Sequence, residues 1–345
     1  MPEKLNSAEE LFDLLQLVLP DLEELLDERY RVLRAVYFLQ PIGRRTLAEY
    51  LESGERSVRN IVEALKQQEL LETTPIGIIT TTKGANTLWL LKGYIEKIKG
   101  IENLEKLIAL KFGLKKVIIV SGDADKDLTA KKEMATAATK LLEKNLQDGM
   151  VVAVSGGTTM AMIADCMETI TEPKAVTVVP ARGGLGEEVE KQANTVAAKM
   201  AKALGGNYRL LHVPDVLEEE LLKPLLSSSY LNEVIEIIKH ADILLHGIGT
   251  AEEMALRRGL QKEFVEKLLE SGAVGEAFGY YFDRKGKIVH TTPSAGLRLE
   301  DLQNISLSIA VGGGMSKAEA ISAFLQVAPI NILVTDEGVA RQLAE

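Results

Sequence analysis

The stretch from residue 151 to residue 163 decides the fold class of the larger part of this chain. It reads Val-Val-Ala-Val-Ser-Gly-Gly-Thr-Thr-Met-Ala-Met-Ile, so four small apolar residues pass through two glycines into a helical pattern. A continuously apolar strand that leads into a helix is typical of a parallel sheet with helices on both faces. The stretch therefore predicts an α/β domain.

The same alternation of strand and helix continues from residue 116 to residue 345. Helical patterns separate six short apolar runs, at Val117–Val120, Val151–Val154, Val176–Val179, Ile243–Leu245, Ile309–Val311 and Ile332–Val334. One segment, 277–292, differs, because alternating aromatic residues and a turn at 283–286 are typical of a β-hairpin. Residues 116–345 are therefore predicted to form a doubly wound, mostly parallel α/β domain with an inserted β-hairpin.

Residues 1 to about 110 show almost no strand pattern, and two short helical patterns lie on either side of Gly54. The apolar residues in 47–51 and 58–65 mark the inward sides of these helices. A glycine-containing turn between two short helices is typical of a helix-turn-helix motif. A small hairpin pattern follows, so residues 1–90 are predicted to form a winged helix-turn-helix domain. Residues 91–115 continue a helical pattern and are predicted to be a helical linker.

The charge of the chain is unevenly distributed. Its 40 basic and 50 acidic residues give a net charge of −10, which argues against a nucleic-acid binder when the chain is taken whole. From Arg29 to Lys66, however, eight basic residues stand against four acidic ones, or +4. Salt confines phosphate attraction to about 10 Å, so this local excess is what matters for DNA.

The second predicted helix and the residues before the first one carry the side chains suited to DNA. Arginine and asparagine can reach base edges, and serine can reach phosphate. The predicted DNA-binding residues are Arg44, Arg45, Glu55, Arg56, Ser57, Arg59 and Asn60. The alternative is a helical hairpin in a protein-interaction domain, with its arginines simply solvated.

Composition excludes several classes of protein. The chain is 46% hydrophobic and 26% charged, which is enough apolar mass for a sizeable core and excludes disorder. No apolar stretch approaches about 18 residues, so no membrane span or membrane partner is expected. Cys166 is the single cysteine, which excludes an internal disulfide and fits a reducing, cytoplasmic compartment. The four histidines lack metal-ligand spacing, so no metal is predicted.

Four glycine-rich turns follow predicted strands, at residues 156–159, 182–186, 247–249 and 312–317. Ligands of an open α/β sheet bind outside the carboxyl ends of its strands, so the four turns should converge on one crevice. Backbone N–H groups at helix N-termini favour anions, and Arg182 and Lys317 add cations. These turns predict a phosphorylated small ligand, and two cations on separate turns suit two anionic groups better than one.

Four other polar residues lie near these turns, and a surface or packing role is the favoured interpretation of each when it is taken alone. They are Gln192, Arg257, Arg258 and Glu276. A different function remains open, namely a sugar-phosphate isomerase-like enzyme with a helical N-terminal appendage. It would need a general base, for which Glu276, His246 and Asp336 are candidates. No strong nucleophile–base pair supports this alternative, so no catalytic residue is predicted.

The order of several short segments resembles the SorC/DeoR-type sugar-responsive transcriptional regulators. The matching segments span roughly residues 25–345. Among them are Gly156-Gly157-Thr158-Thr159, Pro180-Ala181-Arg182-Gly183-Gly184, Gln192-Ala193-Asn194-Thr195, His246-Gly247-Ile248-Gly249, Glu276-Ala277-Phe278-Gly279 and Ser316-Lys317-Ala318-Glu319.

The resemblance implies an N-terminal winged helix-turn-helix and an effector domain similar to sugar-phosphate isomerases. It implies a repressor of a glycolytic operon, not an enzyme, that binds operator DNA as a dimer or tetramer without a cofactor. The implied effector is fructose 1,6-bisphosphate or a related sugar phosphate. Carried onto this chain, one phosphate would meet Gly156, Gly157, Thr158, Thr159 and Lys317. The other would meet Arg182, Gln192, Arg257 and Arg258, with Glu276 at a sugar hydroxyl.

Overall fold

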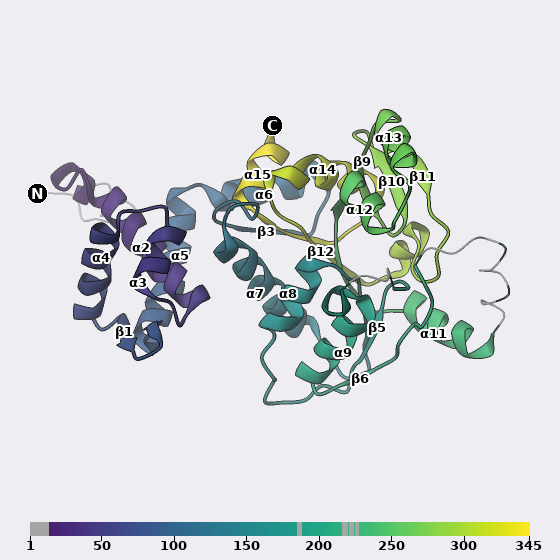
Figure 1. The fold of residues 1–345 in the computed structure, drawn as a ribbon, viewed down its shortest axis with the longest axis horizontal. Helices are drawn as coiled ribbons and strands as arrows, with labels where there is room; N and C mark the ends of the chain where they lie inside the picture. Colours follow the sequence, from purple (N-terminus) through teal and green to yellow (C-terminus); the bar gives the residue numbers. More distant parts are fainter. Residues whose placement is uncertain (1–13, 185–187, 216–219, 221–223, 225–227) are drawn as a thin grey trace, which may run out of the picture. The chain divides into compact units, whose positions relative to one another are not determined.

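The computed structural model describes residues 14–184, 188–215, 220, 224 and 228–345. Its contacts divide the chain into two compact units, Met1–Gly100 and Ile101–Glu345, and Figure 1 labels many of their elements. The predicted end of the first domain at residue 90 falls inside a continuous helix, α5 (Thr82–Ile98). No helix among the described residues is long and apolar enough to cross a membrane.

The first unit contains the predicted helix-turn-helix and wing. Its elements are α2 (Leu22–Leu39), α3 (Arg44–Tyr50), α4 (Glu55–Gln67), β1 (Leu71–Thr74), β2 (Gly77–Thr80) and α5. Leu47 from α3 and Val58 from α4 are buried in a common core with Ile78 of the wing. Thr81 caps the start of α5, because its hydroxyl accepts from Gly84 N–H. A Cβ at Gly84 would lie 1.9 Å from Leu70 O, so only glycine permits this close approach.

The second unit is built on a seven-stranded sheet in which every pair is parallel. The strand order is β3 (Lys116–Val120), β13 (Ile332–Asp336), β12 (Leu307–Val311), β7 (Ile243–Gly247), β4 (Val151–Val154), β5 (Thr177–Pro180) and β6 (Asn207–Tyr208). All six predicted runs are strands, which confirms the α/β interpretation. β6 was not predicted, because it has only two residues and both are exposed.

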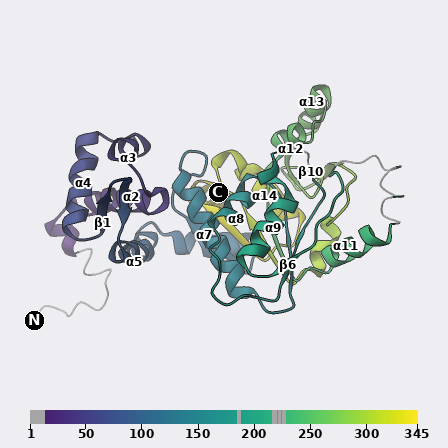
Figure 2. The same ribbon diagram turned by 60° about the horizontal axis from the view of Figure 1, so that its bottom comes forward.

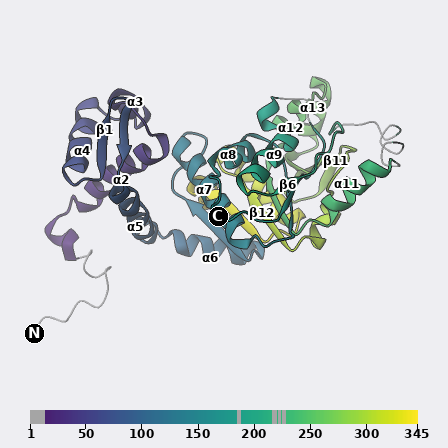
Figure 3. The same cartoon turned by 90° about the horizontal axis from the view of Figure 1, so that it is seen from below.

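Helices cover both faces of this sheet, as a doubly wound fold requires. Alternate strand residues point to opposite faces, so Ala153 and Leu244 belong to one core whereas Val154 and Leu245 belong to the other. Figure 3 shows α7, α8 and α9 on one side of β12 and α6 on the other. The first layer comprises α7 (Leu128–Asn145), α8 (Thr158–Cys166) and α9 (Ala193–Ala203). The second comprises α6 (Ile101–Phe112), α11 (Ser229–Lys239), α14 (Ala318–Val327) and α15 (Glu337–Ala344).

The predicted hairpin is part of a larger antiparallel sheet. Its order is β11 (Ile288–Thr291), β10 (Tyr280–Asp283), β9 (Ala273–Ala277) and β8 (Gly249–Thr250). Two helices pack on it, α12 (Ala251–Arg257) and α13 (Lys262–Glu270), which Figure 2 shows beside β10. β9 turns into β10 through Phe278 and Gly279, whose φ angles of 54° and 83° are those of a tight primed hairpin turn. This turn places Phe278 at the edge of the pocket described next.

Candidate functional site

One pocket lies where several strands of the large sheet end. Its lining includes residues 155–159 after β4, Arg182 and Gly183 after β5, and residues 246–249 at the end of β7. The structure brings all ten of the predicted effector residues to this lining: Gly156, Gly157, Thr158, Thr159, Arg182, Gln192, Arg257, Arg258, Glu276 and Lys317. Their contact with an effector stays a prediction.

The turn at residues 156–159 has the geometry of an anion seat. It forms the N-terminus of α8, and Gly157 takes a φ of 109°, which favours glycine. No side chain among the described residues caps this helix. Arg257 Nη1 lies 3.7 Å from the position of a Cβ at Gly157, so a cation stands beside the turn. Helix dipole, backbone N–H groups and guanidinium together suit a phosphate.

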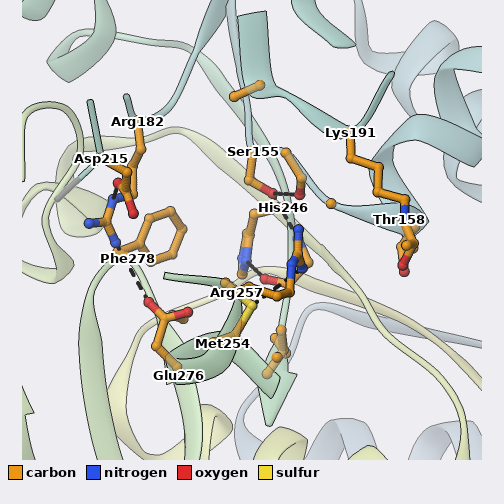
Figure 4. A pocket seen from close by; sticks show the side chains of 18 of the residues that line it. Ser155, Thr158, Arg182, Lys191, Asp215, His246, Met254, Arg257, Glu276 and Phe278 are labelled. Atoms are coloured by element: carbon orange, nitrogen blue, oxygen red, sulfur yellow. Dashed lines mark hydrogen bonds and ion pairs between the residues drawn. The ribbon is translucent and has the colours of Figure 1, made fainter. Parts of the chain in front are cut away.

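Four buried charged residues form the opposite end of the pocket. Asp215 Oδ1 lies 2.9 Å from Arg182 Nε, and Asp215 Oδ2 lies 3.0 Å from Arg258 Nε. Glu276 Oε1 lies 2.9 Å from Arg258 Nη2 and 3.6 Å from Arg182 Nη1. Figure 4 shows Arg182, Asp215 and Glu276 at one side of the pocket, and Thr158 and Lys191 at the other. Two cations and two anions leave this end without net formal charge.

The two arginines of this group differ in how well their charge is compensated. Burial lowers the pKa of Arg182, although Asp215 and Glu276 act against it. Burial also opposes the charge of Arg258, but Glu276 and Asp215 outweigh it and raise the pKa of that guanidinium. Both side chains stay protonated, because the guanidinium of arginine is not deprotonated in proteins.

The structure corrects the expectation that Arg257 and Arg258 face one phosphate together. Arg258 points into the buried ion pairs, and its side chain is only 3% exposed. Arg257 instead lies beside Gly157, where it would act with the α8 turn rather than with Arg182. Consecutive helical residues project about 100° apart, so neighbours at the end of α12 cannot share one direction.

The structure also corrects the expectation for the turn at residues 312–317. Its N–H groups already have carboxylate partners: Gly314 N donates to Asp336 at 2.6 Å, Met315 N to Asp123 at 3.2 Å and Ser316 N to Asp125 at 2.8 Å. This turn is therefore no phosphate cradle. It contributes only Lys317 to the pocket, with Nζ 3.6 Å from Glu253 Oε2.

His246 is fully buried between two aromatic rings in the wall of the pocket. Its ring lies 5.0 Å from that of Phe278 and 5.3 Å from that of Phe324. Nδ1 lies 3.1 Å from Gly247 O, so the carbonyl accepts and Nδ1 carries the proton. Burial lowers the pKa of His246 to about 4, so the imidazole is neutral at physiological pH. His246 adds no charge to the pocket.

The other candidate bases of the enzyme alternative are also held by structural contacts. Glu276 Oε1 accepts from Arg258 and from Gly279 N–H. Asp336 caps α15 and accepts from Val339, Ala124 and Gly314 N–H groups. Within the described part of the chain, no group of three or more histidine, cysteine or acidic residues could hold a metal ion.

Sequence reasoning missed Asp215, Lys191, Met254 and Phe278 in this pocket. Asp215 follows the mostly apolar run at 210–213 and Pro214, so a local signal was present, but the prediction rested on glycine-rich turns alone. Phe278 was assigned to a strand, whereas its positive φ places it in the turn before β10. The predicted turn residues at 185 and 186 lie outside the described residues.

The predicted DNA-binding residues share the exposed surface of α3 and α4. Val58, Val62 and Leu65 bury one side of α4, which leaves the other side to solvent. All seven predicted residues are exposed: Arg44, Arg45, Glu55, Arg56, Ser57, Arg59 and Asn60. Arg34 is only 7% exposed, so one cation of the +4 segment belongs to the core and not to this surface. Contact of these residues with DNA stays a prediction.

Comparisons with known proteins match both units. Residues 96–345 fit a family model described as a sugar-binding domain, and residues 25–95 fit the CggR N-terminal DNA binding domain. The chain is 42% identical over 334 residues to the central glycolytic genes regulator of Priestia megaterium, covering 96% of this chain and 98% of that protein. The Bacillus subtilis regulator of the same name is 41% identical over 326 residues, covering 94% and 96%.

A solved structure agrees with the fold of the larger unit. It is that of a SorC family transcriptional regulator from Enterococcus faecalis, which is 41% identical with a TM-score of 0.66. The match covers 70% of this chain and 100% of that one. The relatives named here are transcriptional regulators, not enzymes.

Proposed function

Because this chain belongs to the SorC family, together with the central glycolytic genes regulators, we propose that it represses a glycolytic operon and that a phosphorylated sugar modulates its DNA binding. The domain pairing carries the proposal, since a DNA-binding unit and a sugar-binding unit occur in one chain. The exposed surface of α4 supports operator binding, because Arg56 and Arg59 face solvent on the side opposite to its buried residues.

We further propose fructose 1,6-bisphosphate as the effector. The observation that carries this step is the presence of two separate groups of anion-binding character in one pocket. One is the α8 turn with Arg257, and the other is Arg182 at the opposite end. Figure 4 shows the ring of Phe278 between Arg182 and His246. Arg182 is therefore spatially separate from the group formed by the α8 turn and Arg257. A sugar with a phosphate at each end suits such a pocket better than a monophosphate.

The proposed effector acts only if it binds the DNA-free and DNA-bound states with different affinities.

The proposal includes a homo-oligomer, dimer to tetramer, because cooperative operator binding would couple several effector sites. Light scattering with and without effector measures this directly. A monomer under both conditions would contradict the oligomeric part of the proposal.

The operator experiment uses fluorescence anisotropy with the labelled upstream region of a glycolytic operon. Binding should weaken about a hundredfold between roughly 50 and 200 mM salt, because phosphate contacts release counterions. The variant Arg56→Ala/Arg59→Ala should lose binding, whereas Arg284→Ala, on the effector domain, should not. Salt-insensitive binding, or a recognition-helix variant that binds normally, would contradict the proposal.

The effector experiment adds sugar phosphates to the preformed complex. Fructose 1,6-bisphosphate should shift operator affinity at concentrations where fructose 6-phosphate and glucose 6-phosphate do not. Equal effects of all three would support a phosphosugar effector but contradict the bisphosphate. Chemical turnover of any of them would favour the isomerase-like alternative.

A further inference from the structure

Arg258 is turned entirely into the protein. Its Nε and Nη2 contact Asp215 and Glu276, and its Nη1 donates to Tyr281 Oη at 3.1 Å. All three nitrogens thus have protein partners, and the side chain is 3% exposed. Arg258 lines the pocket, but each of its three guanidinium nitrogens already donates to a protein oxygen.

Arg182 has the opposite arrangement. Its Nε is fixed by Asp215 at 2.9 Å and by Ser294 Oγ at 3.1 Å. Its Nη1 and Nη2 are buried and have no hydrogen-bond partner among the described residues. Buried donors without an acceptor are unfavourable, so a ligand oxygen at these nitrogens gains a charge-assisted hydrogen bond.

Glu276 is fixed in the same way through one oxygen. Oε1 accepts from Arg258 and from Gly279 N–H. Figure 4 shows its other carboxylate oxygen turned away from Arg182. A carboxylate only accepts hydrogen bonds, so that oxygen suits a sugar hydroxyl and repels a phosphate.

We infer that Asp215 and Arg258 are positioning residues that hold Arg182 and Glu276 ready for a phosphorylated polyol. Asp215 fixes the Nε edge of Arg182, and Arg258 occupies the Oε1 side of Glu276. Without them, Arg182 Nη1, already 3.6 Å from Glu276 Oε1, would close into a bidentate pair with that carboxylate. Both donors and the acceptor would then be lost to the ligand. The inference rests on the proposed effector function of this pocket.

The test is a double variant that removes positioning but keeps the charge balance. Asp215→Asn/Arg258→Gln leaves one cation and one anion, so a change in affinity does not come from net charge. Its control is Arg284→Gln/Glu319→Gln, which removes an exposed ion pair of 2.9 Å elsewhere in the same unit. By calorimetry, the first double variant should bind fructose 1,6-bisphosphate about tenfold or more weakly, and the control within about twofold of the wild type.

Two further readouts separate positioning from general damage. Inorganic phosphate, followed by ³¹P line broadening, reports the α8 turn and should bind both double variants within about twofold of the wild type. In an Arg182→Met background, Asp215→Asn alone should weaken the bisphosphate no further, because the effect of Asp215 passes through Arg182. Loss of both ligands in parallel, or losses that simply add in this cycle, would overturn the inference.

Ser294→Ala provides the test if the double variant fails to fold. Ser294 Oγ donates to Asp215 Oδ1 at 3.0 Å and accepts from Arg182 Nε. Its removal therefore weakens the positioning of Arg182 by Asp215 without removing either charged residue. We expect a weakening of about threefold for the bisphosphate and no change for inorganic phosphate. An unchanged bisphosphate affinity in a folded Ser294→Ala protein overturns the inference alone. Absence of sugar-phosphate binding by the wild type would instead overturn the proposed effector, and the inference with it.

Discussion

Two glycine-rich turns at the same edge of the large sheet resemble each other in sequence but differ in chemistry. The turn after β4, residues 156–159, enters α8 with no side-chain cap among the described residues and with Arg257 alongside, although its Gly157 N–H donates to Lys191 O at 2.8 Å. The turn after β12, residues 312–317, has three N–H groups bonded to carboxylates. Backbone N–H groups bind a ligand anion only when the protein has not supplied its own. We call residues 312–317 the closed turn and residues 156–159 the open turn. We expect substitutions at the closed turn to change stability and substitutions at the open turn to change effector binding.

The largest expected effect is that of Asp336→Ala on stability. Asp336 is fully buried and accepts from three backbone N–H groups, those of Ala124, Gly314 and Val339. The variant leaves these donors unpaired and should lower the free energy of unfolding by about 3–4 kcal/mol. Urea unfolding followed by circular dichroism measures the change.

The matched control is Asp242→Ala. Asp242 accepts from a single backbone N–H group, that of Val151, at 2.8 Å. It should lower the free energy of unfolding by only about 1 kcal/mol. In the folded fraction of either variant, effector affinity should stay within about twofold of the wild type. A large loss of affinity in folded Asp336→Ala would show that the closed turn takes part in binding.

The second effect concerns His246 at the end of β7. This strand lies between β12 and β4, so the turn after it lies between the two turns compared above. The pKa of His246 is lowered from 6.5 to about 4 by burial, so below pH 6.5 only the unfolded chain takes up this proton. Its stabilising contribution is complete above pH 6.5 and is lost as pH falls toward 4. Between pH 7 and 4.5 the loss should be about 2.5 kcal/mol.

Comparison with His246→Phe isolates this contribution from the titration of carboxylates. The variant should lose less stability than the wild type over the same pH interval, as measured by urea unfolding at each pH. Identical pH dependence in the two proteins would contradict a neutral, buried His246. A neutral imidazole matters for the comparison, because a charged one would bring a cation between the two turns.

The third effect tests the open turn itself. Arg257→Gln removes the guanidinium beside Gly157 and should weaken fructose 1,6-bisphosphate binding about tenfold, since a charge-assisted contact is lost. Calorimetry measures this, and Arg284→Gln, an exposed arginine of the same unit, serves as the control. Operator binding without effector should stay unchanged in both. Unaltered effector affinity in Arg257→Gln would remove the open turn from the site.

The parts of this fold that sequence predicted are those whose signals are local. Each long strand is a continuous apolar run, and α3 and α4 bury evenly spaced apolar residues around Gly54. β9 was missed because its residues, Ala-Val-Gly-Glu-Ala, place a glycine and a glutamate inside a strand. Glycine and glutamate are both uncommon in strands, and here tertiary packing overrides that preference.

The chemistry of the site was less predictable, because its partners are distant in sequence. Asp215 and Arg258 are 43 residues apart, and Arg182 and Ser294 are 112 apart. Of the carboxylates that close the turn after β12, Asp123 and Asp125 lie 192 and 191 residues before their partners, and Asp336 lies 22 residues after its own. Residue types and turns therefore indicated which residues meet in the pocket, but not which of them the protein itself pairs.

The smallest expected effect is that of Asp125→Asn, which probes whether the closed turn can be opened. Asp125 is exposed, and its carboxylate accepts from Ser316 N at 2.8 Å and from Ser316 Oγ at 3.0 Å. Asparagine keeps one oxygen to accept from the N–H, so the free energy of unfolding should change by less than about 0.5 kcal/mol. Asp336 and Asp123 still hold the neighbouring N–H groups, so the effector affinity should stay within about twofold. Tighter binding of the bisphosphate to Asp125→Asn, measured by calorimetry against the wild type, would mean that removing one carboxylate converts this turn into a second anion seat. The difference between the turns would then be one of degree, set by a single side chain.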